Sequence, residues 1–242
     1  MKIDSEWAHT GRAFAWAYGG LLIVAGVLVT VVSVGIPPTA PDLAKHYAYI
    51  RQIWPELYIS FLLFIAAFAS LIAIGVVLRE FFGRDIRSEL MYASFLAAGV
   101  VGMVWMLSQI GSAQVVARDS AGMSPQDLNI LGTSSSIWSG VINWLQRGYL
   151  LFASLGTLWT GRIVLRQRSL PVGLGWLSIA LAVFYWLGLA NLLLVDAGVS
   201  FASELGSLLV AIGAVLALAW SGWLGWAIGR SGGQFRTSTP MH

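Results

Sequence analysis

The sequence contains no cysteine and few charged side chains. The absence of cysteine excludes disulfides, thiolate catalysis, iron–sulfur clusters and cysteine-ligated zinc. Only 10% of the 242 residues are charged, whereas soluble domains carry about 25%. Hydrophobic residues make up 57% of the chain, and the mean hydropathy is +0.77. This composition excludes an ordinary soluble domain and a disordered chain, and it indicates a polytopic membrane protein.

Histidine is scarce as well, and its positions limit the cofactor chemistry. His9, His46 and His242 all lie outside the long apolar stretches. Bis-histidine haem needs histidine inside a helix bundle, and a copper or zinc cluster needs several ligands within reach of one another. The sequence therefore predicts no metal and no cofactor, while a bound lipid or isoprenoid remains compatible with it.

Long charge-free runs are what the chain has in abundance. A helix that crosses about 30 Å of hydrocarbon needs roughly 20 apolar residues, and six stretches are long enough. We predict a single all-α domain, a polytopic transmembrane bundle of six helices, with a flexible tail over 230–242. A re-entrant fourth segment, which would leave five helices, is the alternative. The predicted spans are residues 13–36, 57–78, 90–117, 137–161, 170–195 and 205–229. The first run is too long for the apolar region of a signal peptide, so we expect it to stay as an anchor.

The basic residues are distributed unevenly over the predicted loops. Of the 14 Lys and Arg residues, ten fall on one side, three on the other, and Arg147 lies within a span. Lysine and arginine favour the cytoplasmic side, which predicts that both termini are cytoplasmic. The basic loops also contain Glu80, Asp85 and Glu89, so we expect no binding of nucleic acid.

Both longer outer loops carry signals for short helices. In the first, Leu43, Tyr47, Ile50 and Trp54 fall on one helical face, which predicts an amphipathic helix. It would be either a lid packed on the bundle or a helix in contact with lipid.

In the second outer loop, Ser124 occupies an N-cap position and Pro125 follows it, a strong signal for a helix start. We expect a short helix over 125–131, followed by a turn at 132–136.

Small residues recur four positions apart in three predicted spans, a spacing that lets helix backbones approach closely in lipid. We interpret them as packing positions within the bundle, and a homodimer seam is the alternative. They are Ser94, Ala98 and Gly102, then Ala153, Thr157 and Gly161, then Gly225 and Gly229.

Arg147 is the only formal charge within a predicted span. It lies about 14 Å below the outer start of the fourth span. Near a helix centre an arginine costs roughly 2.5–3.5 kcal/mol, so we expect it to face the bundle and to be paired. Asn143 shares its helical face. Gln109 lies roughly 12 Å below the outer end of the third span, at nearly the same depth.

Polar side chains in the spans are concentrated toward the outer side. Every Asn and Gln in a span lies in the outer half, and carboxylates surround the outer rim. This asymmetry predicts a polar, outward-facing cavity with Arg147 at its floor. The alternative is a structural ion pair between Arg147 and one of the rim carboxylates. The predicted ligand-binding residues are Arg147, Asn143, Gln146, Gln109, Asn191, Glu56, Asp196 and Glu204.

Three stretches resemble a bacterial family of six-helix membrane proteins that carries a domain of unknown function. They are Gly11-Arg12 before the first span, the long loop before the second, and Ser169-Leu-Pro-Val-Gly-Leu-Gly-Trp176 at the start of the fifth. The resemblance covers most of the chain. It implies six helices and a bacterial cytoplasmic (inner) membrane, and it supplies no reaction and no catalytic residue.

Three functions remain open. The first is a non-enzymatic membrane subunit or binding protein whose outer cavity holds a lipid, an isoprenoid or quinone head group, or a partner segment. The lack of catalytic groups favours it. The second is a small transporter or channel, for which the inner half offers no polar path. The third is a membrane-embedded enzyme for an amphiphilic substrate, with Glu56 or Asp196 as acid or base. Expected partners are the lipid bilayer and either other membrane subunits or a second copy of the chain.

Overall fold

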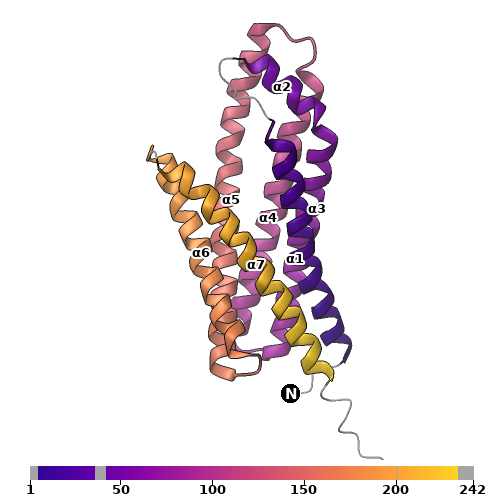
Figure 1. The fold of residues 1–242 in the computed structure, drawn as a ribbon, viewed down its shortest axis with the longest axis vertical. Helices are drawn as coiled ribbons and strands as arrows, with labels where there is room; N and C mark the ends of the chain where they lie inside the picture. The colour runs from indigo at the N-terminus through magenta and orange to yellow at the C-terminus, as the bar shows by residue number, and fades with distance from the viewer. Residues whose placement is uncertain (1–4, 36–41, 200, 234–242) are drawn as a thin grey trace, which may run out of the picture.

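Six long apolar helices and one short helix make up the part of the chain that the structure describes. The structure is a computed structural model that describes residues 5–35, 42–199 and 201–233, apart from the side chains at 5, 203, 204, 207 and 231–233. The long helices, each apolar enough to cross a membrane, confirm the predicted all-α bundle (Figure 1). They are α1 (Ser5–Ser33), α3 (Trp54–Phe82), α4 (Ile86–Asp119), α5 (Pro125–Gln167), α6 (Val172–Asp196) and α7 (Ala202–Gly233); the short one is α2 (Leu43–Gln52).

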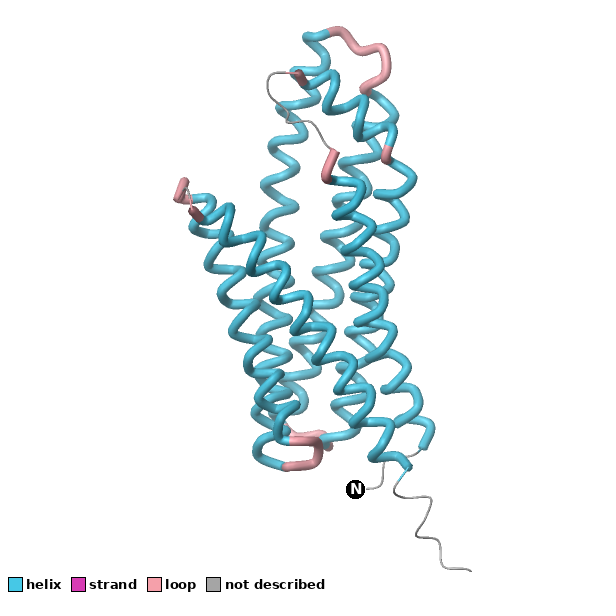
Figure 2. The backbone as a smooth tube through the Cα atoms, viewed as in Figure 1, coloured by secondary structure: helices cyan, strands magenta, loops and turns pink. Residues whose placement is uncertain are grey.

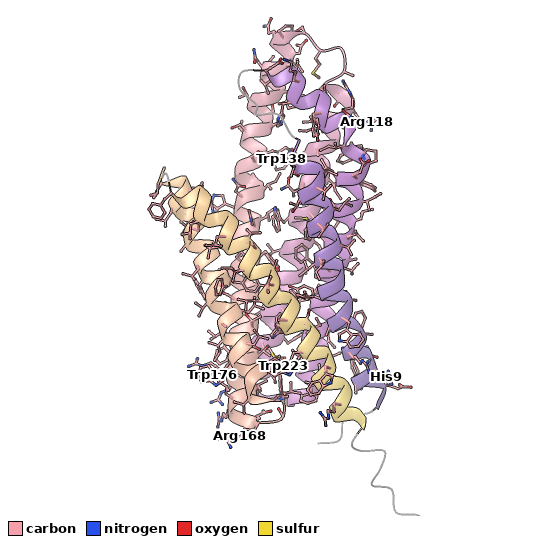
Figure 3. All side chains as sticks on the ribbon, in the orientation of Figure 1. His9, Arg118, Trp138, Arg168, Trp176 and Trp223 are labelled. Atoms are coloured by element: carbon pink, nitrogen blue, oxygen red, sulfur yellow. The ribbon has the colours of Figure 1, made fainter. Side chains whose placement is uncertain are left out.

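The long helices form a closed ring. Each packs chiefly against two others, in the order α1, α3, α4, α5, α6 and α7, and α7 packs back against α1. We call the end where α1 begins and α7 finishes the proximal end, and the end that holds α2 the distal end (Figure 2). Side chains labelled in Figure 3 mark the two ends: His9, Arg168, Trp176 and Trp223 are proximal, and Arg118 and Trp138 are distal.

Aromatic side chains fill the ring. Phe68 of α3 and Tyr149 of α5 lie with their ring centroids 4.8 Å apart. Tyr18 of α1 meets Trp220 of α7 edge-on at 6.4 Å, and Trp220 also contacts Phe95 of α4 at 6.0 Å. Large rings of this kind contribute both buried apolar area and edge-on ring contacts. The core therefore joins helices that do not neighbour one another in the ring.

Local capping sets where the helices begin. At the start of α4, the Asp85 carboxylate accepts the backbone N–H of Ser88 at 2.8 Å, and the Ser88 hydroxyl accepts that of Asp85 at 3.0 Å. This reciprocal pair is a capping box. At the start of α5, the Ser124 hydroxyl accepts the N–H of Asp127 at 3.2 Å, and Pro125 is the first helical residue. The predicted start at Ser124 is confirmed.

The predicted turn at 132–136 is wrong, because α5 continues through it as one helix. The serine and threonine side chains there bond back within the helix instead of ending it. Thr133 donates to the carbonyl of Asn129 at 3.0 Å, and Ser139 donates to that of Ser135 at 2.9 Å. Such bonds to the preceding turn satisfy the hydroxyls while the helix continues. The predicted helix over 125–131 and the span 137–161 are therefore parts of one helix.

The short helix α2 is a lid on the distal end. It packs against α3, α4 and α5, and its own Tyr47 is buried. The lid alternative is thus the correct one, although Trp54 belongs to α3. Asp42 caps α2, and the hydrogen bond from the backbone N–H of Lys45 lowers the pKa of its carboxyl.

The distal ends of the helices are unequal in height. In Figure 1, α4 and α5 extend well past the distal ends of α1, α6 and α7. Pro125–Gln167 makes α5 a 43-residue helix, whereas α6 has 25 residues. The distal parts of α4 and α5, together with α2, therefore form an extension beyond the ring.

Glycines lie at close contacts inside the ring, as the packing interpretation predicts. A Cβ added to Gly161 of α5 would lie 2.7 Å from the carbonyl oxygen of Gly175 in α6. One added to Gly225 of α7 would lie 3.2 Å from the carbonyl oxygen of Arg12 in α1. By contrast, Gly140 of α5 has open space around it.

Replacing Gly161 by alanine should therefore force α5 and α6 apart. We expect Gly161→Ala to lower the free energy of unfolding by about 1–3 kcal/mol, the usual cost of overpacking. Gly140→Ala is the matched control on the same helix and should be neutral or slightly stabilising. Thermal unfolding in detergent measures both variants. Equal melting temperatures for the two would contradict the close α5–α6 contact.

Candidate functional site

Arg147 forms an ion pair that joins α5 to the distal end of α6. Its guanidinium donates to the Asp196 carboxylate. The Arg147 side chain is only 6% exposed, whereas that of Asp196 is 52% exposed. The pair therefore has a buried cation and a half-exposed anion. The sequence left open a ligand cavity with Arg147 at its floor or a structural ion pair with a rim carboxylate. The structure provides the carboxylate for the ion pair, that of Asp196.

The ion pair leaves part of the guanidinium unused. The Arg147 group lies 4.6 Å from the ring centroid of Trp144, one turn earlier on α5. Its Nε is buried and has no hydrogen-bond partner among the described residues. On the same side of the fold, the buried Oδ1 of Asn191 also lacks one. Unsatisfied buried polar atoms are rare and often mark an unseen water, ion or ligand.

The other residues predicted on α4 and α5 do not join Arg147. Asn143 is exposed, and Gln146 is half-buried. Gln109 is one turn beyond Trp105 of α4, whose ring stacks on that of Tyr149 with centroids 6.1 Å apart. Among the described residues, the side-chain hydrogen bond of Arg147 goes to Asp196 and not to Gln109. The predicted match in depth between Gln109 and Arg147 stays a prediction.

The predicted residues on the other helices divide in a similar way. Asn191 is buried and faces α7, where its Nδ2 lies 2.9 Å from a Cβ added to Gly206. Glu56 is exposed in the first turn of α3. The side chain of Glu204 lies outside the described residues. The structure thus unites Arg147 with Asp196 alone among the predicted residues whose side chains it describes.

The distal extension accounts for the polar asymmetry seen in the sequence. Most amides of the predicted outer half lie on the distal parts of α4 and α5, which continue past the ring (Figure 1). Their polarity follows from that position. It does not require a cavity with Arg147 at its floor.

A groove that the sequence analysis missed lies on this extension, between α2 and α5. Its volume is about 790 Å³, within the usual range for ligand sites of about 300–1,000 Å³. None of the eight predicted ligand-binding residues lines it. Six of its nine lining residues carry a hydroxyl or an amide group and one carries an imidazole. The nine are Leu43, His46, Tyr47, Asn129, Gly132, Thr133, Ser135, Ser136 and Ser139. The serine-rich stretch that favoured a turn was the available signal for this site.

A tyrosine cluster in the middle of the ring was missed as well. The hydroxyls of Tyr18 and Tyr149 lie 3.4 Å apart, and the ring of Tyr185 meets Tyr149 edge-on at 6.2 Å. Three helices, α1, α5 and α6, supply these side chains. Nearby, the buried indole N–H of Trp105 has no partner among the described residues. The cluster supplies polar contacts within an otherwise aromatic core.

Comparison with known proteins adds no assignment. No family model, curated protein or solved structure matches the chain. The resemblance to a bacterial six-helix family therefore stays a prediction. Among the described residues, no three histidine or acidic side chains are grouped closely enough to hold a metal ion.

Because Arg147 is buried and Asp196 is half-exposed, replacing Asp196 should lower the stability of the protein more than replacing Arg147 does. We expect Asp196→Asn to lower the free energy of unfolding by about 1–2 kcal/mol, because it leaves a buried cation unpaired, with the effect reduced by solvent around Asp196. Arg147→Met should cost less, because the buried charge itself disappears. The double variant should resemble Arg147→Met.

Chemical denaturation in detergent measures this double-mutant cycle. Arg84→Gln, which breaks the exposed Arg84–Glu80 pair, is the control and should change stability by less than about 0.5 kcal/mol. The ion pair would lose its structural importance if Asp196→Asn matched this control.

Proposed function

We propose that this protein is a non-enzymatic membrane subunit or binding protein that uses its distal groove to hold a polar segment of a partner protein. The observation that carries the proposal is the 790 Å³ groove between α2 and α5, in which six of the nine lining residues carry a hydroxyl or an amide group. Such groups recognise a ligand by hydrogen bonding, and the lining contains neither lysine, arginine nor a carboxylate. An uncharged polar ligand suits this lining best.

The position of the groove favours a partner segment over a lipid head group. Gly132, at the middle of the groove, lies about 45 Å along α5 from Arg162, a basic residue near the proximal end. The hydrocarbon core is about 30 Å thick, and head groups extend it to about 40–45 Å. Most of the groove would then lie outside the bilayer. A lipid, isoprenoid or quinone head group would reach only its lower edge, near Ser139.

By the same measure, the Arg147–Asp196 pair would lie near the distal surface of the bilayer. Arg147 lies about 22 Å from Arg162 along α5. An arginine at that depth can reach the interface through its long side chain. The half-exposed Asp196 fits this position, and it makes a catalytic role for the pair in mid-membrane unnecessary.

The packed interior of the ring favours a binding protein over a channel. Phe68, Phe95, Tyr149 and Trp220 fill its middle, and most of their surface is buried. A conducting path would need polar groups along the ring axis. The tyrosine cluster supplies them at one level only.

Orientation completes the proposal. The proximal end carries most of the basic residues, which favours a cytoplasmic proximal end and an external groove. By its resemblance to the bacterial six-helix family, the membrane would be a bacterial cytoplasmic membrane.

The absence of native cysteine gives a direct test of this orientation. Single-cysteine variants at Ser136, Ser169 and Val183 can be treated with a membrane-impermeant maleimide in intact spheroplasts and in inverted vesicles. We expect labelling at 136 only in spheroplasts and at 169 only in inverted vesicles. Val183, which is exposed on α6, should face lipid and stay unlabelled in both. Labelling of 136 and 169 from the same side would contradict the proposed placement.

A bulky residue in the groove should displace the partner segment. In protein extracted with mild detergent, native mass spectrometry should show a bound polypeptide for the wild type and for Ser134→Trp, but not for Ser136→Trp. Ser136 lines the groove, whereas the exposed Ser134 on the same helix does not. A retained lipid that Ser136→Trp removes would show a head-group site instead. A bound polypeptide that survives Ser136→Trp would rule out the groove.

A further inference from the structure

The arginines at the proximal end differ in whether they have partners. Arg79 pairs with Glu89 at 2.7 Å, and Arg84 pairs with Glu80 at 2.8 Å. Three others stack on tryptophan rings of their own helices: Arg12 on Trp16, Arg162 on Trp159 and Arg230 on Trp226. These five side chains are already engaged.

Arg87 and Arg166 are not engaged in this way. Among the described residues, neither has a carboxylate within ion-pair distance or a ring beneath its guanidinium. Both line one pocket of about 470 Å³ between the start of α4 and the end of α5. The other lining residues are Asp85, Ile86, Ile163 and Gln167. Two unpaired cations thus share a cavity of ligand size.

Fixed backbone holds this pocket in shape. The Asp85 carboxylate accepts the N–H groups of Arg87 at 3.1 Å and Ser88 at 2.8 Å, so its charge is used in capping α4. On the opposite wall, the Gln167 amide donates to the carbonyl of Phe82 at 3.4 Å and ties the end of α5 to α3. Ile163 is buried beside it. The two guanidinium groups therefore project from anchored helix ends.

We propose that this proximal pocket binds the phosphate group of an anionic phospholipid. Guanidinium groups recognise phosphate through paired hydrogen bonds, and two of them suit one phosphodiester. Basic pockets at the ends of transmembrane helices are a common setting for such head groups. The pocket lies at the opposite end from the α2–α5 groove and does not depend on it.

The surroundings of the pocket favour a lipid over a soluble phosphate. Arg166 lies about 10 Å beyond Trp159 along α5, and exposed tryptophans mark the interfacial level at this end. Trp176 and Trp223 lie at the same end of the ring (Figure 3). Ile86, at the rim, is 77% exposed and gives an acyl chain an apolar surface. A phosphate in the pocket would therefore sit at head-group depth.

The test measures phospholipid binding to the delipidated, full-length protein in detergent by native mass spectrometry. The probe is phosphatidylglycerol, and phosphatidylcholine serves as the zwitterionic comparison. We expect Arg87→Gln/Arg166→Gln to weaken binding of phosphatidylglycerol by about a hundredfold, because each guanidinium in the pocket loses charge-assisted hydrogen bonds to the phosphate that contribute at least about tenfold. The matched control, Arg84→Gln/Arg230→Gln, removes the same charge from the same end and should change binding less than about threefold.

Arg87→Lys/Arg166→Lys keeps the charge and guards against a folding defect in the glutamine pair. It should fall between wild type and the glutamine pair, because lysine cannot form the paired hydrogen bonds. If the glutamine pair does not fold, a lysine pair that binds like wild type overturns the proposal.

If the glutamine pair and the matched control weakened binding of phosphatidylglycerol equally, the attraction would be diffuse electrostatics and the proposed pocket would be wrong. Unchanged binding in the glutamine pair, or equal affinity for phosphatidylcholine, would do the same. Glycerol 1-phosphate should not displace phosphatidylglycerol at equal concentration. Displacement would assign the pocket to a soluble phosphate ester instead.

Discussion

The requirement that a chain satisfy its own backbone hydrogen bonds within hydrocarbon governs this structure. No water is available there to pair with N–H and C=O groups, so a spanning segment of this apolar composition must be helical. Six such segments follow one another along the chain, and the short helix α2 lies between the first two of them (Figure 2). Each helix then packs beside the next one in the chain, and α7 closes the ring against α1. The order of helices in the ring is therefore the order in the sequence.

Close packing of the ring depends on the alternation of small and large side chains. Lipid provides little hydrophobic drive for helices to associate, so contact area and polar bonds have to hold them together. Glycines bring α5 against α6 and α7 against α1, while Phe68, Tyr149 and Trp220 fill the interior. The bond from the Trp220 indole N–H to the Ser178 hydroxyl, at 2.9 Å, links α7 to α6 within this core. Polar side chains in the ring thus reinforce packing.

The two ends of the molecule differ in chemistry because the helices finish together at the proximal end and at unequal heights at the distal end. At the proximal end the helices finish together, and arginines and tryptophans gather there (Figure 3). At the distal end α4 and α5 continue past the others and are covered by α2. This extension accounts for the amides and hydroxyls that made the sequence polar on one side. Arg147 lies below it, where α6 supplies the anion.

Local features of the sequence determined the number of long helices, the start of α5 at Ser124 and the amphipathic face of α2. Run length, capping residues and helical periodicity depend only on neighbours in the chain, so they could be predicted. The continuation of α5 through residues 132–136 could not, because turn-like composition gave way to hydroxyl bonds within the helix and to packing on α2 and α4. The partner of Arg147 is 49 residues away, and the sequence left three rim carboxylates, Glu56, Asp196 and Glu204, as alternatives. The α2–α5 groove and the sorting of paired from unpaired arginines likewise depend on segments far apart in sequence. Only the tertiary structure sets those distances, because it fixes how far each helix extends and which faces meet.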